Sequence, residues 1–215
     1  LQNRLNGYKS ELMKTVIIIA SWSSGSSAVA GYIDKCGAYS CPPHLNTIDE
    51  RTPNSYEPLA YKKELSNLFN DLTFEEIGDA NDFVSFFESW YEIESQKAKN
   101  LGLNHIVLKH PLQTFILPYL YQKLNPLFVF VTRPFEEIEK TRKRRNWHEV
   151  YGSKGAETIY SVSFNFLCNN SCPSISIPFN AFINDNELRS KLLNFIELTP
   201  SAEQVKSAES FLRRE

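Results

Sequence analysis

The sequence lacks a long hydrophobic run, a large excess of either charge and a cysteine pattern typical of a metal site. Its most apolar short segment, 16–20, is far below the ~20 residues that span a bilayer, so no membrane span is expected. The 25 acidic residues nearly balance 23 Lys and Arg residues, which argues against a dedicated nucleic-acid binder. The four cysteines lie in two loose pairs whose spacing fits no zinc site, and we expect neither a metal nor a disulfide scaffold.

What is present is the composition of an ordinary globular protein. Of the 215 residues, 42% are hydrophobic and 13% are aromatic, which is enough to fill one sizeable core. We therefore expect a single domain over residues 1–215. Residues 1–14 are polar and have no feature of a signal peptide, so a cytoplasmic location is expected. The sequence indicates no oligomeric state.

Short β-branched segments alternate with helical patterns along the chain. Strands are predicted at 14–20, 105–109, 127–132 and 174–178. Helices are predicted at 26–36, 59–70, 82–101, 112–124, 134–147 and 156–169, with two more across 187–215. Residues 40–58 contain four prolines and are predicted to be irregular. The alternation predicts an α/β three-layer sandwich with a central parallel sheet, whose functional sites lie beyond the carboxyl ends of the strands.

The first predicted strand runs into a loop rich in serine, which then opens a helix. A helix N-terminus carries unpaired N–H groups and a partial positive charge, so this loop is a candidate anion site. Its candidate ligands are the consecutive residues Ser23, Ser24, Gly25, Ser26, Ser27 and Ala28. A loop that hydrolyses ATP or GTP would carry glycine at Ala20 and lysine at Ser26, so a magnesium-assisted hydrolase is disfavoured. A loop that only caps the helix is the simpler alternative.

A second candidate anion site follows the third predicted strand. Arg133 ends that strand, and Pro134 suits the first turn of the next helix. Thr141 lies about two helical turns further on and on the same face, so a guanidinium and a hydroxyl can converge on one phosphate. The basic run at 142–145 is interpreted as a solvated helix face.

The second predicted strand ends in Lys109, His110 and Pro111. A lysine at this edge can neutralise charge on a transferred group, and a histidine can take a proton from a hydroxyl nucleophile near neutral pH. The alternative is that His110 only packs against a helix that begins at proline.

Together these segments resemble the sulfotransferases that use 3′-phosphoadenosine 5′-phosphosulfate (PAPS), particularly the bacterial members of that family. The resemblance extends from the strand at Val16 to the last helices. Residues 22–28 look like the family's 5′-phosphosulfate loop, and Arg133 with Thr141 looks like the pair that holds the 3′-phosphate. The resemblance therefore implies PAPS as the donor, and adenosine 3′,5′-bisphosphate (PAP) as the product, without a metal.

The resemblance to this family extends to the residues that would carry out the reaction. Lys109 and His110 resemble the strand end that carries the catalytic base, and Glu57 lies in a segment similar to the glutamate-bearing segment of bacterial members. The resemblance implies the fold of P-loop nucleoside triphosphate hydrolases and transfer of a sulfuryl group to an acceptor hydroxyl or amine. His110 is the first candidate for the general base, and Glu57 is the second. Small-molecule, carbohydrate and lipid acceptors all stay open.

One position departs from the family pattern. Ser23 stands where the phosphosulfate loop carries a basic residue that bridges the leaving phosphate, and the late Arg-Lys-Gly motif of cytosolic members is absent. Two other classes of function therefore stay open. A P-loop kinase for a nucleotide or small molecule predicts magnesium-dependent ATP binding, whereas a non-catalytic protein predicts PAP binding without turnover.

Overall fold

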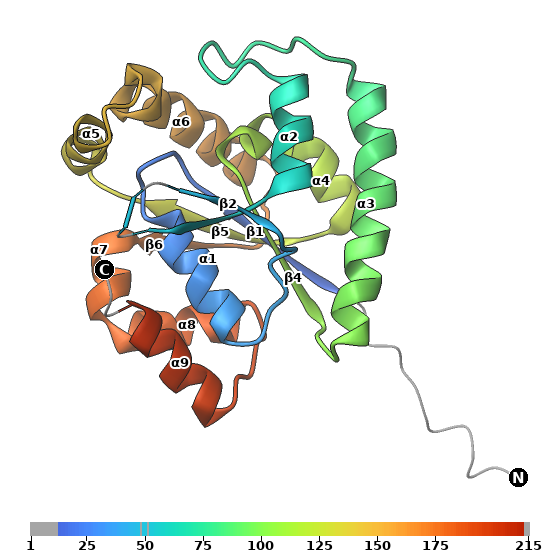
Figure 1. The fold of residues 1–215 in the computed structure, drawn as a ribbon, viewed down its shortest axis with the longest axis vertical. Coiled ribbons are helices and arrows are strands. Elements are labelled where there is room, and N and C mark those ends of the chain that lie inside the picture. Colours follow the sequence, from blue (N-terminus) through green and yellow to red (C-terminus); the bar gives the residue numbers. More distant parts are fainter. Residues whose placement is uncertain (1–12, 48, 51, 213–215) are drawn as a thin grey trace, which may run out of the picture.

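The structure of the protein is a computed structural model, and its described residues are 13–47, 49–50 and 52–212. The polar segment 1–12 and the end of the last predicted helix, 213–215, lie outside them. Strands pair in parallel in the order β4-β1-β5-β6 (Figure 1). In chain order they are β1 (Lys14–Ile19), β4 (His105–Lys109), β5 (Leu127–Thr132) and β6 (Ser174–Pro178). These strands confirm the four predicted strand segments.

The central strand β1 shows why the sheet is buried on both faces. Its sequence, KTVIII, ends in a continuous apolar run, as expected for a parallel strand that is covered on both sides. Val16 and Ile18 belong to the core on one face, Ile17 and Ile19 belong to the core on the other, and all four are fully buried. Two hydrophobic cores thus flank one sheet, which confirms the predicted three-layer sandwich.

Helices from different parts of the chain cover the two faces (Figure 1). One face is covered by α1 (Ser26–Lys35), α7 (Phe179–Asn184), α8 (Asn186–Phe195) and α9 (Ala202–Leu212). The other face is covered by α2 (Leu59–Leu68), α3 (Ala80–Asn100), α4 (Leu117–Leu124) and α6 (Ser153–Asn169). The helix α5 (Phe135–Arg144) follows β5 and contacts α6. In the described part of the chain, none of the helices is both long and apolar enough to cross a membrane.

The prediction that 40–58 is irregular was wrong in part. The segment contains a short antiparallel pair, β2 (His44–Asn46) and β3 (Asn54–Pro58). Pro53 precedes β3 and Pro58 is its last residue, and strands tolerate proline at such end positions. Glu57 therefore lies on an ordered strand, β3. Because β3 also contacts β4, Glu57 lies beside the main sheet.

One helix prediction needs correction, and two short helices were not predicted. The segment predicted as one helix at 112–124 begins as a 3₁₀ helix, η1 (Pro111–Ile116), and α4 starts anew with Pro118 in its first turn. Proline lacks the N–H that would continue an α-helical ladder across this point. The helix α7 was not predicted, because six residues directly after a strand are too few to show helical periodicity. A second 3₁₀ helix, η2 (Glu149–Tyr151), was not predicted either.

The order of the strands brings three candidate segments to one edge of the sheet. The strand β1 lies between β4 and β5, and the three run in the same direction. The serine loop follows β1, Lys109 ends β4, and Arg133 follows β5. Parallel strands end on the same side of a sheet, so these residues share its carboxyl edge.

We expect Leu108→Ala to lower the free energy of unfolding by ~2–5 kcal/mol, because truncation of a fully buried core side chain leaves a cavity. Urea denaturation followed by circular dichroism measures this change. Leu101→Ala is the matched control: that side chain is 65% exposed, and its loss should change the free energy by no more than ~0.5 kcal/mol. Equal losses in both variants would contradict the core described above.

Candidate functional site

The loop after β1 enters α1 through a glycine in the left-handed region. Gly25 has a φ of 88°, and a Cβ there would lie 2.2 Å from the Phe179 ring, so only glycine fits. No side chain of the described residues caps the N-terminus of α1, and its first turn has no acidic residue. The first N–H groups of α1 therefore lack a side-chain acceptor in the described part of the chain, as an anion-binding helix end requires.

Arg133, just before α5, contacts Thr141 in the second half of that helix, as the spacing predicts. Arg133 Nη1 donates to the Thr141 hydroxyl at 3.2 Å and to the Ser23 carbonyl at 3.2 Å. Arg133 Nε donates to the Glu137 carboxylate at 3.0 Å, and the guanidinium lies 5.0 Å from the centre of the Phe179 ring. The guanidinium is thus held in one orientation beside the serine loop.

Lys109 forms a buried ion pair with Glu57. Lys109 Nζ donates to Glu57 Oε1 at 2.7 Å, to the Ser27 hydroxyl at 3.2 Å and to the Ser55 carbonyl at 3.0 Å. The side chains of the pair are only 5% and 8% exposed. Burial by itself raises the pKa of Glu57, but the nearby charge of Lys109 and its hydrogen bond to the carboxylate outweigh burial, so the pKa falls below its usual value. Glu57 is therefore an ionised carboxylate at neutral pH.

His110 is a buried, neutral histidine. Its Nδ1 accepts a hydrogen bond of 3.2 Å from the Leu112 N–H at the start of η1. Burial lowers the pKa of the ring to about 4. With Nδ1 as the acceptor, the single proton of the neutral ring lies on Nε2. In this conformation His110 offers a hydrogen-bond donor rather than the lone pair that a general base needs.

These groups line one cleft of about 970 Å³. The residues predicted from the sequence that line it are Ser23, Gly25, Ser26, Ser27, Ala28, Glu57, Lys109, His110, Arg133 and Thr141. Ser24 is not among the lining residues: its side chain is fully buried, and its hydroxyl donates to the Ser21 carbonyl at 2.7 Å. The Ser24 hydroxyl stabilises the loop from inside and is not available to a ligand.

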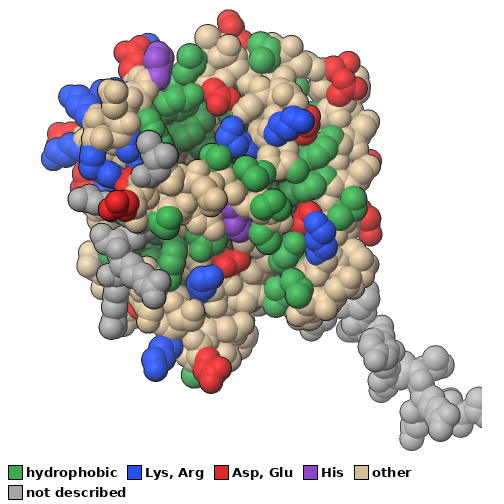
Figure 2. Space-filling model, in the orientation of Figure 1, with side chains coloured by type: hydrophobic (Ala, Val, Ile, Leu, Met, Phe, Trp, Pro, Cys, Tyr) green, Lys and Arg blue, Asp and Glu red, His purple; other side chains and the backbone are tan. Residues whose placement is uncertain are grey.

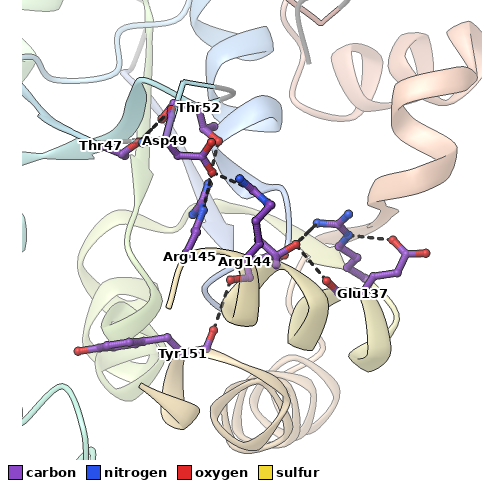
Figure 3. Close-up of polar contacts among 10 residues, drawn as sticks. Thr47, Asp49, Thr52, Glu137, Arg144, Arg145 and Tyr151 are labelled. Atoms are coloured by element: carbon purple, nitrogen blue, oxygen red, sulfur yellow. Dashed lines mark hydrogen bonds and ion pairs between the residues drawn. The ribbon is translucent and has the colours of Figure 1, made fainter. Parts of the chain in front are cut away.

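The sequence analysis missed one wall of the cleft, which is drawn in Figure 3. Arg145 Nε lies 2.6 Å and Arg144 Nη2 lies 2.8 Å from Asp49 Oδ2. Arg145 also donates to the Thr52 hydroxyl at 2.9 Å, and its guanidinium lies 4.6 Å from the centre of the Trp147 ring. The basic run was predicted as a solvated helix face, but the Arg145 side chain is only 15% exposed. No local pattern could reveal this, because Asp49 and Arg145 are 96 residues apart in sequence.

Aromatic side chains form a further part of the cleft that sequence reasoning did not assign. Trp22, Trp147 and Tyr151 line it together with Lys62 and Asp71. In the space-filling view, a hollow with hydrophobic side chains at its base lies beside the Lys and Arg side chains over α5 (Figure 2). These aromatic residues come from the loop after β1 and from the segment between α5 and α6, so only the tertiary structure brings them together.

Comparison with known proteins supports the fold. The chain matches the sulfotransferase domain of the olefin synthase from Synechococcus PCC 7002 with a TM-score of 0.57, over 92% of this chain and 78% of that domain. The chain has the fold of a sulfotransferase domain. The sequence identity of that match is 14%, so the likeness is one of fold. No protein-family profile and no curated protein sequence matches this chain.

We expect the free energy of unfolding to decrease as the pH is lowered from 6.5 to about 4, because of His110. Because burial lowers the pKa of this ring from 6.5 to about 4, the unfolded chain takes up the proton first as the pH falls. The contribution is fully present above pH 6.5 and amounts to ~3 kcal/mol, which is lost by about pH 4. Urea denaturation of His110→Asn across this range should show a shallower pH slope than the wild type. His148→Asn, an exposed control, should keep the wild-type slope.

Proposed function

We propose that this protein is a sulfotransferase that moves a sulfuryl group from PAPS to a hydroxyl or amine of an acceptor. One observation carries the proposal: two anion-binding groups from separate strands line a single cleft. They are the serine-lined N-terminus of α1 and the pair of Arg133 with Thr141. The 3′- and 5′-substituents of PAPS branch from one ribose, so they need two adjacent anion sites. The hydrogen bond from Arg133 to the Ser23 carbonyl makes these two sites neighbours.

The cation that the phosphosulfate loop lacks at Ser23 comes, in this proposal, from the neighbouring strand. Lys109 Nζ reaches the hydroxyl of Ser27, in the first turn of α1. An ammonium at this point stabilises the negative charge that develops on the leaving 5′-phosphate. The N–H groups of α1 and the hydroxyls of Ser26 and Ser27 supply the remaining donors. The donor set thus fits a phosphosulfate group without a lysine in the loop itself.

The residues of the cleft also fit the proton transfer that the reaction requires. PAPS supplies a sulfuryl group whose sulfur forms a bond to the acceptor oxygen or nitrogen as its bond to the 5′-phosphate oxygen breaks. Glu57 takes the proton of the acceptor, because its carboxylate is ionised, buried and part of the cleft wall. The pKa of Glu57 rises when the roughly four negative charges of the donor enter the cleft, and the carboxylate becomes a stronger base.

This proposal reverses the order of the two base candidates. Neutral His110 presents Nε2–H, and its other ring nitrogen already accepts a hydrogen bond from the Leu112 N–H, so it has no free lone pair for the acceptor proton. Its proposed role is to donate a hydrogen bond into the cleft from a ring that the Leu112 N–H holds in place. Glu57 differs because it is an ionised carboxylate, so its oxygens offer lone pairs to an acceptor proton. Its partner Lys109 can also turn part of its charge towards the donor.

Ser23 favours a second candidate function, a non-catalytic protein that binds PAP. The two functions share the nucleotide site and differ only in turnover. A P-loop kinase is less well supported, because Ser26 occupies the position of the lysine that such enzymes place on the phosphates.

Titration calorimetry tests the donor site. We expect PAP to bind without magnesium and more tightly than Mg-ATP, and Arg133→Ala to weaken PAP binding by ~1.5–3 kcal/mol, the range for hydrogen bonds to charged groups. Lys143→Ala is the matched control, because Lys143 is an exposed residue of α5 outside the cleft lining. Preference for Mg-ATP, or unchanged PAP affinity in Arg133→Ala, would contradict the proposed donor.

Turnover tests the base. With an acceptor found by screening phenols, amines and sugars against radiolabelled PAPS, Glu57→Gln should lower turnover ~10²–10⁴-fold, the range for loss of a general base. PAP affinity should stay near the wild-type value, since the amide oxygen of the introduced side chain would still accept a hydrogen bond from Lys109. His110→Asn should reduce turnover by a smaller factor. A larger loss in His110→Asn than in Glu57→Gln would return the role of base to His110.

A further inference from the structure

Beyond the reacting groups, the cleft continues along a wall of aromatic rings. The Trp22 ring contacts the Tyr151 ring with centroids 4.9 Å apart, and Tyr151 contacts Trp147 at 6.0 Å. Phe74 stacks on Trp22 at 6.1 Å and supports it. Trp22 also lies at right angles to the His110 ring at 6.4 Å. The wall therefore begins directly beside the proposed reacting groups, where an acceptor would lie.

Asp71 is a half-buried carboxylate in this part of the cleft. Two other carboxylates of the cleft have cationic partners: Glu57 pairs with Lys109, and Asp49 pairs with two arginines. Asp71 forms neither an ion pair nor a side-chain hydrogen bond with any residue that the structure describes. A partly desolvated carboxylate without a partner favours the approach of a cation.

Asp71 lines the cleft together with Lys62 and His110. After burial, the charges that act on the pKa of His110 include those of both Lys62 and Asp71. Asp71 lies in a turn in which the Phe74 N–H donates to the Asn70 carbonyl at 2.8 Å, and the Phe74 ring stacks on Trp22. Asp71 therefore lies beside the aromatic wall.

We propose that the acceptor is a hydroxyl compound that carries a protonated amine, which binds between the Asp71 carboxylate and the rings of Trp22 and Tyr151. This inference rests on the proposed sulfotransferase function, in which the acceptor hydroxyl lies at Glu57. Aromatic rings and a carboxylate together attract an ammonium group. The amine also adds positive charge to a cleft that must hold the roughly four negative charges of the donor. A carboxylate on the acceptor would instead face Asp71 and be repelled.

Three phenols with the same ring and a similar two-carbon arm test the charge preference: tyramine, 4-ethylphenol and 3-(4-hydroxyphenyl)propionate, which are cationic, neutral and anionic. Calorimetry or ligand-observed NMR gives their affinities for the protein with and without saturating PAP. We expect tyramine to bind about tenfold more tightly than 4-ethylphenol, the size of an ion pair combined with a cation–π contact. The propionate should bind most weakly, and PAP should widen the difference.

Two variants assign the preference to Asp71. Asp71→Asn should weaken tyramine binding about tenfold, the loss of one partly desolvated charge pair, and leave 4-ethylphenol binding unchanged. Glu76→Gln removes a charge from the same segment at an exposed residue outside the cleft lining and should change neither affinity. Failure of tyramine to bind, equal affinities for tyramine and 4-ethylphenol, or unchanged tyramine binding in Asp71→Asn would each overturn the proposal.

The same titrations separate this proposal from the proposed function. If the protein binds PAP but shows no preference for the cationic phenol, only the amine proposal is refuted. If the protein prefers tyramine in the absence of nucleotide but does not bind PAP, only the proposed donor is refuted.

Discussion

The buried ion pair between Lys109 and Glu57 is the interaction on which the candidate site depends. It joins the end of β4, the strand β3 and, through the hydroxyl of Ser27, the first turn of α1. Removing one partner of such a pair leaves an uncompensated buried charge and costs ~3–5 kcal/mol. Loss of either charge therefore lowers the stability of the protein at the candidate site. The same pair holds a carboxylate and an ammonium in a cleft where an apolar pair would be easier to bury.

The helix α5 connects the two ends of the cleft. Two of its residues, Glu137 and Thr141, accept hydrogen bonds from the Arg133 guanidinium. Its last residue, Arg144, binds Asp49 together with the following Arg145 (Figure 3). Asp49 lies between the strands β2 and β3, and β3 bears the carboxylate of the buried pair. A single helix thus orients the proposed 3′-phosphate site and also anchors the segment that leads to the proposed base.

How much of the site could be predicted from the sequence depended on how local each interaction is. Arg133 lies just before α5, and Thr141 lies eight residues further on, so helical periodicity was enough to predict their contact. Two other contacts, Asp49 with Arg145 and Trp22 with Tyr151, join residues that are far apart in sequence. No periodicity connects such residues. The chemical state of His110 was also out of reach, because it depends on burial and on the hydrogen bond that its ring accepts from the Leu112 N–H.

The sequence by itself determined the alternation of buried strands and amphipathic helices, and with it the parallel three-layer fold and the edge of the sheet where the site lies. These features follow from local apolar patterns and from the rule that parallel strands end on one side. Only the tertiary structure decided that Glu57 lies on a paired strand within reach of Lys109, that Ser24 turns its hydroxyl inward, and that aromatic rings and Asp71 line the same cleft. Those outcomes depend on contacts between distant segments, whose energies no local pattern contains.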